Sequence, residues 1–304
     1  MKHIKLIGLL ALSMALASCE KVSLDELLSK EPPTTEPSST GNASLSIHIG
    51  GIADANYADA AAKGTRAIEP IGKVCTKLTI SVYNVEGQRV YSVNKKSTDA
   101  DFANATMKLA EGKYHLVIVA HSNEKNATTT DINQITFESN KLSDTFHYYK
   151  EIELQAGGNN IDVVMERVTA MFRLKITDEI PENVKQLKFY YTGGSSTLSG
   201  YTGAGSVNSR QTEIRNVQSG INTYEVYTFP QPDDKKLKMT ITALDASGET
   251  VCTKTFEDVA VSKNVITRYK GSFFTNITPP TAADNYKFSI SANTDWKGEN
   301  VIEF

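Results

Sequence analysis

Apolar and polar residues alternate in short runs over most of the chain, a pattern that predicts half-buried β-strands. The first run places Leu45, Ile47 and Ile49 on one face of a strand. Further runs follow, separated by turn-forming residues, and none keeps a helical period for long. They lie at residues 77–83, 88–93, 116–120, 152–154, 161–165, 172–176, 187–191, 224–229, 237–243, 250–255 and 265–274. Many short strands with turns between them predict β-sandwiches, and thus an all-β fold.

The length of the chain predicts more than one sandwich. It has 304 residues, and a single core rarely grows past ~250. We expect an N-terminal β-sandwich domain at 44–166 and a C-terminal one at 167–304, with the junction near Arg167. Residues 77–90 and 238–251 are similar hairpins, which hints that the two domains are related.

The N-terminus is typical of an exported protein. Lys2, His3 and Lys5 precede an apolar run at residues 6–17, which is shorter than the ~20 residues that span a bilayer and fits a signal peptide. The run ends in Leu16-Ala17-Ser18-Cys19, which resembles the lipobox of bacterial lipoproteins. We therefore expect a signal peptide at 1–18 and lipid, with palmitate among its acyl chains, on Cys19. Residues 19–43 are rich in Pro, Ser and Thr and predict a disordered tether.

Composition and motifs favour a structural protein. The formal net charge is only −3, too small a field to hold nucleic acid. The five histidines are scattered without metal-ligand spacing, and no nucleophile elbow is present. We predict no enzyme activity, no cofactor and no metal site. Cys75 and Cys252 each lie in a strand-like run, and we favour two unpaired thiols over a disulfide.

Two aromatic features leave alternatives open. Tyr190, Tyr191 and Tyr201 border a Gly/Ser-rich loop at 192–206. They could form a platform for a sugar, although packing on a strand face is the simpler interpretation. Trp296, the one tryptophan, could seal a hydrophobic cluster or contact a partner.

Several features, taken in order, resemble the fimbrillin superfamily, the subunits of type V pili in Bacteroidales-type bacteria. The resemblance covers nearly the whole chain. It rests on the lipobox at Cys19, the tether, and the segments 43–49, 64–67, 78–84, 109–121, 165–170 and 295–296.

The resemblance implies two tandem transthyretin-like β-sandwiches and assembly by strand exchange. A lipid-anchored precursor at the cell outer membrane would be cut by a surface trypsin-like protease, at Arg66-Ala67 in this chain. The first strand, with Leu45, Ile47 and Ile49, would then leave. A neighbour's C-terminal segment would fill the groove; here that donor lies at 285–292, where Tyr286, Phe288 and Ile290 alternate. The product is an extracellular fimbrium with a role in adhesion.

The implied partners are other pilus subunits, the protease and a host or bacterial receptor. The three aliphatic side chains of the first strand represent roughly 5–9 kcal/mol of burial, enough to favour a replacement strand. The loop containing Arg66 favours a processed subunit. The alternatives are an uncleaved lipid-anchored fimbrial anchor, a tip subunit, or a glycan-binding surface lipoprotein.

Overall fold

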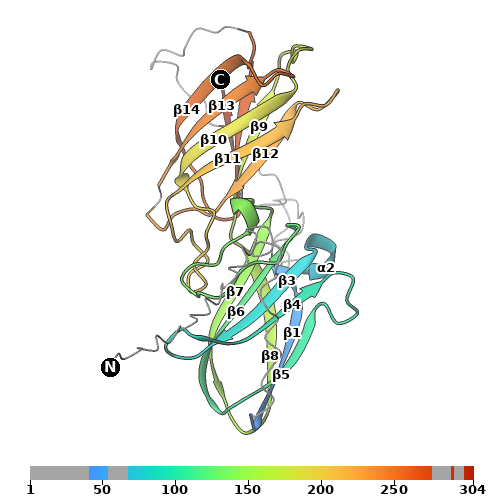
Figure 1. Ribbon diagram of the computed structural model, residues 1–304, viewed down its shortest axis with the longest axis vertical. Helices are drawn as coiled ribbons and strands as arrows, with labels where there is room; N and C mark the ends of the chain where they lie inside the picture. The colour runs from blue at the N-terminus through green and yellow to red at the C-terminus, as the bar shows by residue number, and fades with distance from the viewer. Residues whose placement is uncertain (1–40, 54–67, 234, 276–288, 291–297) are drawn as a thin grey trace, which may run out of the picture. The chain divides into compact units, whose positions relative to one another are not determined.

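The computed structural model describes residues 41–53, 68–233, 235–275, 289–290 and 298–304, all within one compact unit. Almost all regular structure in these residues is β-strand (Figure 1). The helices within this described part are short: α2 (Ile71–Val74) and the 3-10 turn η1 (Glu138–Asn140). The predicted all-β class is therefore confirmed.

The strands up to residue 167 form the first sandwich. One layer holds the order β2-β1-β8, with β5 also paired to β1, and the other holds β7-β6-β3-β4. The layers join at one corner, where β7 and β8 pair through Phe146↔Arg167 and His147↔Glu166. The strands are β1 (Ala43–Ala53), β2 (Ile68–Glu69), β3 (Lys77–Tyr83), β4 (Arg89–Lys96), β5 (Asn104–Leu109), β6 (Gly112–His121), β7 (Thr145–Leu154) and β8 (Gly157–Arg167).

The remaining strands form the second sandwich, whose layers are β12-β9-β15-β17-β16 and β11-β10-β13-β14. Each sandwich has its own hydrophobic core. The strands are β9 (Ala170–Ile176), β10 (Gln186–Gly194), β11 (Ser209–Asn216), β12 (Thr223–Thr228), β13 (Leu237–Leu244), β14 (Thr250–Val259), β15 (Val265–Gly271), β16 (Ser289–Ile290) and β17 (Gly298–Glu303).

The two sandwiches share one strand order. In the first, β1 runs parallel to β8 and antiparallel to β5; in the second, β9 runs parallel to β15 and antiparallel to β12. The facing layers β4-β3-β6-β7 and β11-β10-β13-β14 also correspond. This order equates β3 with β10. The sequence similarity between 77–90 and 238–251 instead pairs β3 with β13, and it is wrong as a repeat because adjacent antiparallel strands share the hairpin pattern.

One predicted break in the first sandwich is strand. Residues 157–160, Gly-Gly-Asn-Asn, were expected to separate two short strands. They form the start of β8 and pair in register with residues 43–46 of β1. Glycine weakens a strand because it has no side chain to pack, but here the paired β1 backbone holds this stretch extended.

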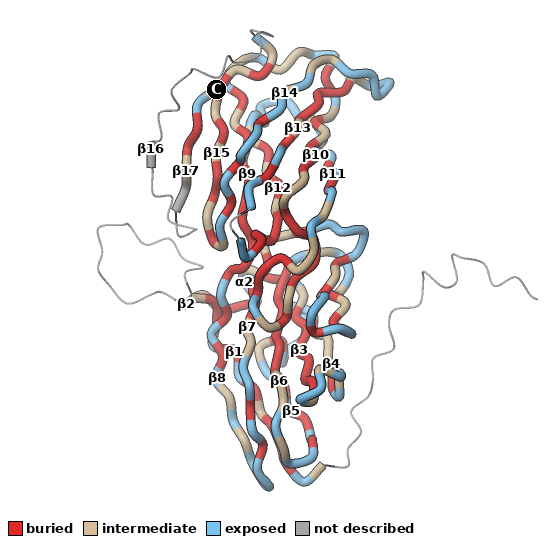
Figure 2. The backbone as a smooth tube through the Cα atoms, turned by 90° about the vertical axis from the view of Figure 1, so that its left-hand side faces the viewer, coloured by how far each residue is buried: buried red, intermediate tan, exposed pale blue. Residues whose placement is uncertain are grey.

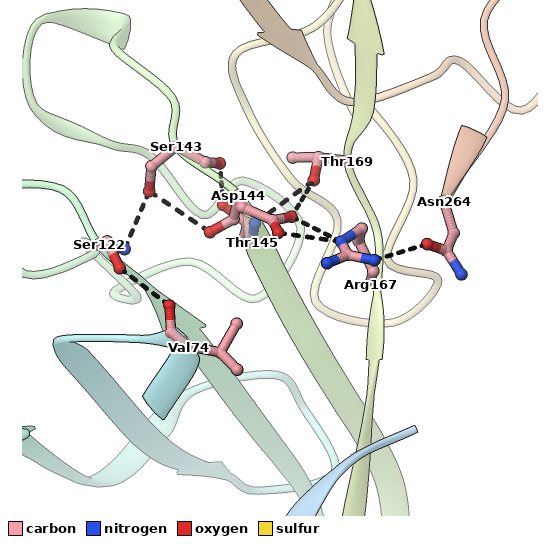
Figure 3. A network of polar contacts seen from close by, with 8 residues as sticks. All are labelled: Val74, Ser122, Ser143, Asp144, Thr145, Arg167, Thr169 and Asn264. Atoms are coloured by element: carbon pink, nitrogen blue, oxygen red, sulfur yellow. Dashed lines mark hydrogen bonds and ion pairs between the residues drawn. The ribbon is translucent and has the colours of Figure 1, made fainter. Parts of the chain in front are cut away.

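An ion pair between the buried Arg167 and the half-buried Asp144 lies where the chain passes from β8 to β9 (Figure 3). The Arg167 guanidinium donates through Nε to both carboxylate oxygens of Asp144, at 2.8 and 3.0 Å, and through Nη1 to Asn264 at 2.9 Å. Thr169 donates to the same carboxylate at 3.0 Å. Arg167 ends the first sandwich and Asn264 precedes β15, so the network joins both halves. The division at 166 and 167 stays a prediction.

Removing the carboxylate should destabilise the protein strongly. We expect Asp144→Ala to lower the free energy of unfolding by about 3–5 kcal/mol, because it takes a carboxylate away from an arginine whose side chain is only 5% exposed. Glu257→Ala is the control, since the Glu257–Lys238 pair has side chains 58% and 59% exposed and should be worth less than about 1 kcal/mol. Equal shifts of the two variants in denaturant unfolding would contradict this.

Candidate functional site

The first strand, β1, is paired along both edges (Figure 2). On one side it runs parallel to β8, from Ala43↔Gly157 to Ile52↔Met165. On the other it runs antiparallel to β5 over residues 43–48, and then to β2 over residues 52 and 53. A strand held this way is an interior element of its layer, and taking it out would leave two unpaired edges facing each other.

The apolar face of β1 enters the core of the first sandwich. Ala43, Leu45, Ile47, Ile49 and Ile52 are all at most 2% exposed and belong to one hydrophobic cluster. The four large side chains among them represent about 6–12 kcal/mol of burial, at ~1.5–3 kcal/mol each. That is comparable with the whole stability of an ordinary domain, ~5–15 kcal/mol.

The polar face of β1 makes only a few side-chain bonds. His48 Nδ1 lies 2.8 Å from Asn104 Oδ1 of β5, at an exposed position. Asn159 Nδ2 of β8 donates to the Ser44 carbonyl at 3.3 Å. Sequence-specific attachment of β1 therefore comes mainly from its apolar face, while the backbone ladders are open to any extended chain.

Most of the predicted processing residues lie outside the described residues. These are Cys19, Arg66, Ala67, Tyr286 and Phe288. Trp296, which could seal a hydrophobic cluster or contact a partner, also lies outside them. Leu45, Ile47 and Ile49 are described, and their removal stays a prediction. Ile290 lies in β16, where it pairs with Asn300 of β17. The structure therefore places one end of the predicted donor segment within a sheet of its own second sandwich.

The C-terminal strand β17 was not predicted from the sequence. It runs parallel to β15 from Val265↔Gly298 to Lys270↔Glu303, and buries Val301 and Ile302. The ring of Phe304 lies 5.0 Å from that of Phe256. Apolar residues at 302 and 304 were the available signal, but two positions are too few to identify a strand.

The Gly/Ser-rich loop at 192–206 packs against the first sandwich. Leu198 is buried and exchanges backbone hydrogen bonds with Ile135, at 2.8 and 2.9 Å. The Tyr201 ring meets His115 and Tyr149 at centroid distances of 5.3 and 5.5 Å. The loop is thus packed against the first sandwich.

Of the bordering tyrosines, Tyr191 is buried and its hydroxyl donates to the Tyr227 carbonyl at 2.8 Å. Its ring face is therefore closed to a ligand. Tyr190 is 39% exposed, and Tyr201 makes edge-to-face contacts with His115 and Tyr149. The three do not form one platform, because adjacent residues of a strand point to opposite faces.

Other chemistry is sparse in the described part of the chain. No three His, Cys, Asp or Glu side chains gather there as metal ligands would. Cys75 and Cys252 are both free thiols, and burial raises the pKa of each. Within the same residues, we find no helix with the length and apolar character to span a bilayer.

These features define a class: an all-β chain of two sandwiches whose first strand is buried and paired on both edges. A family profile described as a family of unknown function (DUF6562) matches residues 35–303, and the chain belongs to that family. No curated protein matches the chain.

Solved structures that match include fimbrial proteins. A candidate adhesin from Bacteroides ovatus has a TM-score of 0.47 and 12% identity, covering 70% of this chain and 77% of its own. A fimbrial assembly protein from Parabacteroides distasonis has a TM-score of 0.39 and 15% identity, and the match covers 76% of this chain and 90% of that protein. The fimbrial anchor protein Mfa2 from Porphyromonas gingivalis has a TM-score of 0.42 and 10% identity, and the match covers 71% of this chain and 82% of that protein. Fimbrial proteins are thus among the structures that the chain resembles, as the sequence led us to expect. Likeness at this level carries no argument about function.

Truncating the apolar face of β1 should destabilise the first sandwich. We expect Ile47→Ala to lower the free energy of unfolding by about 2–5 kcal/mol, because it opens a cavity in the core. Val85→Ala is the control: Val85 is 58% exposed, and its truncation should change stability by within about 0.5 kcal/mol. A similar small change for both, measured by denaturant unfolding, would show that β1 adds little to the core.

Two buried histidines predict loss of stability in acid. Burial, together with the nearby charges of Lys77 and Lys263 respectively, lowers the pKa of His121 and of His147 from 6.5 to about 4, and the hydrogen bond to the Gly200 carbonyl opposes this for His147. The unfolded chain therefore binds more protons between these values. Stability is full above pH ~6.5 and falls towards pH ~4, by about 3 kcal/mol per histidine.

A glutamine variant tests this assignment. His147 Nε2 lies 2.8 Å from the Gly200 carbonyl, and a glutamine amide can donate the same bond without titrating. Thermal unfolding of His147→Gln between pH 7 and 4.5 should show a shallower slope than the unmodified chain. An unchanged slope would remove His147 as a cause.

Proposed function

We propose that this chain is a structural subunit of a cell-surface fimbria with a role in adhesion. It is exported as a lipoprotein, carried on lipid at Cys19 in the outer membrane, and cut after Arg66. It then polymerises by donor-strand exchange with other pilus subunits. A fimbrial assembly protein and a fimbrial anchor protein occur among the matching structures, but the proposal rests on this chain's own first strand.

The observation that carries the proposal is the position of β1. This strand fills the core with four large aliphatic side chains, yet it joins the rest of the fold only through residues 54–67, which contain Arg66. A cut there would free β1 covalently while leaving its pairing intact. The strand could then be replaced by another of matching alternation, because the backbone ladders accept any extended chain.

The energetics favour exchange over an empty groove. Loss of β1 uncovers apolar surface worth about 6–12 kcal/mol by area burial and exposes the facing edges of β8 and β5. A cut chain would therefore be held in a folded state only while a strand occupies the groove. A second copy's C-terminal segment at 285–292 offers Tyr286, Phe288 and Ile290 in the same alternation.

The glycan-binding alternative finds less support. It needs an accessible aromatic platform around residues 192–206, and that loop is largely buried against the first sandwich. The anchor and tip alternatives use the same fold, so they are separated by processing and not by geometry.

Limited proteolysis tests the proposal directly. Lipid-free precursor treated with an arginine-specific protease should give a product that starts at Ala67 and then a ladder of oligomers on size-exclusion chromatography. Other arginines lie in strands, among them Arg89, Arg167 and Arg173, where cleavage is slow.

Matched variants identify the site. Arg66→Gln should stay uncut and monomeric, whereas Lys63→Gln, three residues away, should behave as the unmodified chain. A chain that is not cut at Arg66, or is cut without growth into oligomers, contradicts a stalk role and favours the anchor or tip assignment.

A further inference from the structure

The groove that β1 occupies ends at β2, which pairs with the last two residues of β1. After Ile49 the register between β1 and β8 shifts, so that Ile49 pairs with Val163 and Gly51 with Val164. Beyond this bulge, β1 pairs with β2 through Ile52↔Glu69 and Ala53↔Ile68. We call β2 the clasp, since it covers the point where the chain leaves the groove.

The clasp lies directly against Gly51. A Cβ atom built on Gly51 would lie 2.4 Å from the Glu69 carbonyl oxygen and 2.4 Å from Ile68 Cγ2. Both distances are too short for a real contact, and the oxygen belongs to the backbone. Gly51 also has φ +152°, which other residues rarely adopt. Pairing between β1 and β2 therefore requires glycine at this position.

The C-terminal segment has no glycine to offer there. No glycine occurs between Gly271 and Gly298, so no register of residues 285–292 places one at the position of Gly51. Aligning Gly298 itself with Gly51 would put Glu299 in the place of Ile52, which is fully buried. Burying an unpaired carboxylate is costly, so that register is excluded.

The incoming chain must nevertheless pass the clasp. A donor parallel to β8, as β1 is, leads out of the groove at the β2 end, and its residues continue towards Gly298, where β17 begins. From this we infer that strand exchange evicts β2: the clasp is paired in the precursor and leaves the sheet when a second copy's C-terminal segment enters. This inference rests on the proposed strand exchange.

Cleavage after Arg66 prepares the eviction. The new N-terminus at Ala67 precedes β2 by one residue, so β2 stays attached only through α2. Glu69 also forms an ion pair of 3.7 Å with Lys73, whose side chain is 72% exposed. Within the sheet, β2 is ordered next to β1, so loss of β1 removes the strand with which β2 pairs.

Amide hydrogen exchange, resolved at residues 68 and 69, tests the inference in the precursor and in the polymer. We expect protection in the precursor and exchange at least tenfold faster in the polymer, while residues 157–165 of β8 stay protected in both. A polymer that protects β2 as well as the precursor does would overturn the inference. If no polymer forms, the proposed function fails instead.

Variants of the precursor test the geometry without any polymer. Gly51→Ala should speed exchange at residues 68 and 69 at least tenfold and leave residues 44–49 unchanged. Gly50→Ala is the matched control, because a Cβ there has only the Val163 carbonyl oxygen nearby, at 3.8 Å, and should leave β2 protected. Equal exchange in the two variants would overturn the role of Gly51.

A glycine placed in the donor should reverse the eviction. Residues 291–294 come directly after the alternating segment, so one of them would occupy the position of Gly51 in each register that buries this segment. Single glycine variants at these four positions supply the missing glycine. We expect one of them to restore protection of β2 in the polymer. Restoration by none of them, when the unmodified polymer has lost protection, would point to a cause other than the missing glycine.

Discussion

The fold of the first sandwich depends on the burial of one face of β1. Leu45, Ile47, Ile49 and Ile52 lie in the core, and the strand is paired on both edges. The polar face contributes little beyond the contact between His48 and Asn104. Apolar burial is not directional, so any strand with suitable alternation can supply it. The same interaction that stabilises the precursor would therefore allow replacement.

The shared strand order of the two sandwiches shows what distinguishes β1. Its counterpart β9 likewise lies between one parallel strand, β15, and one antiparallel strand, β12. However, β9 follows β8 after two residues, beside the ion pair of Arg167 and Asp144. No comparable break could free it without cutting through this network. β1 instead connects through the segment that contains Gly64-Thr65-Arg66-Ala67, so strand exchange, as we propose it, would act on the first sandwich.

Local alternation made much of the fold predictable. The strands around Leu45, Leu78, Phe172 and Leu187 follow from a period of two residues, since each places alternate apolar side chains in a core. Polar strands could not be predicted in this way. β11, Ser209–Asn216, lies at a sheet edge and consists mostly of polar and charged residues. Local alternation also could not predict which segments pair. The approach of β2 to Gly51 and the packing of Leu198 on Ile135 join residues that are apart in the sequence. The candidate site was predicted as a strand, whereas its neighbours came only from the structure.

Uptake of a labelled peptide with the sequence of residues 43–53 tests the central claim most directly. The account predicts that the chain cut after Arg66 takes up the peptide in exchange for its own first strand, that the uncut chain does not, and that a peptide with aspartate at position 47 fails. The account would be contradicted if the cut chain lost β1 with no change in melting temperature and bound neither peptide.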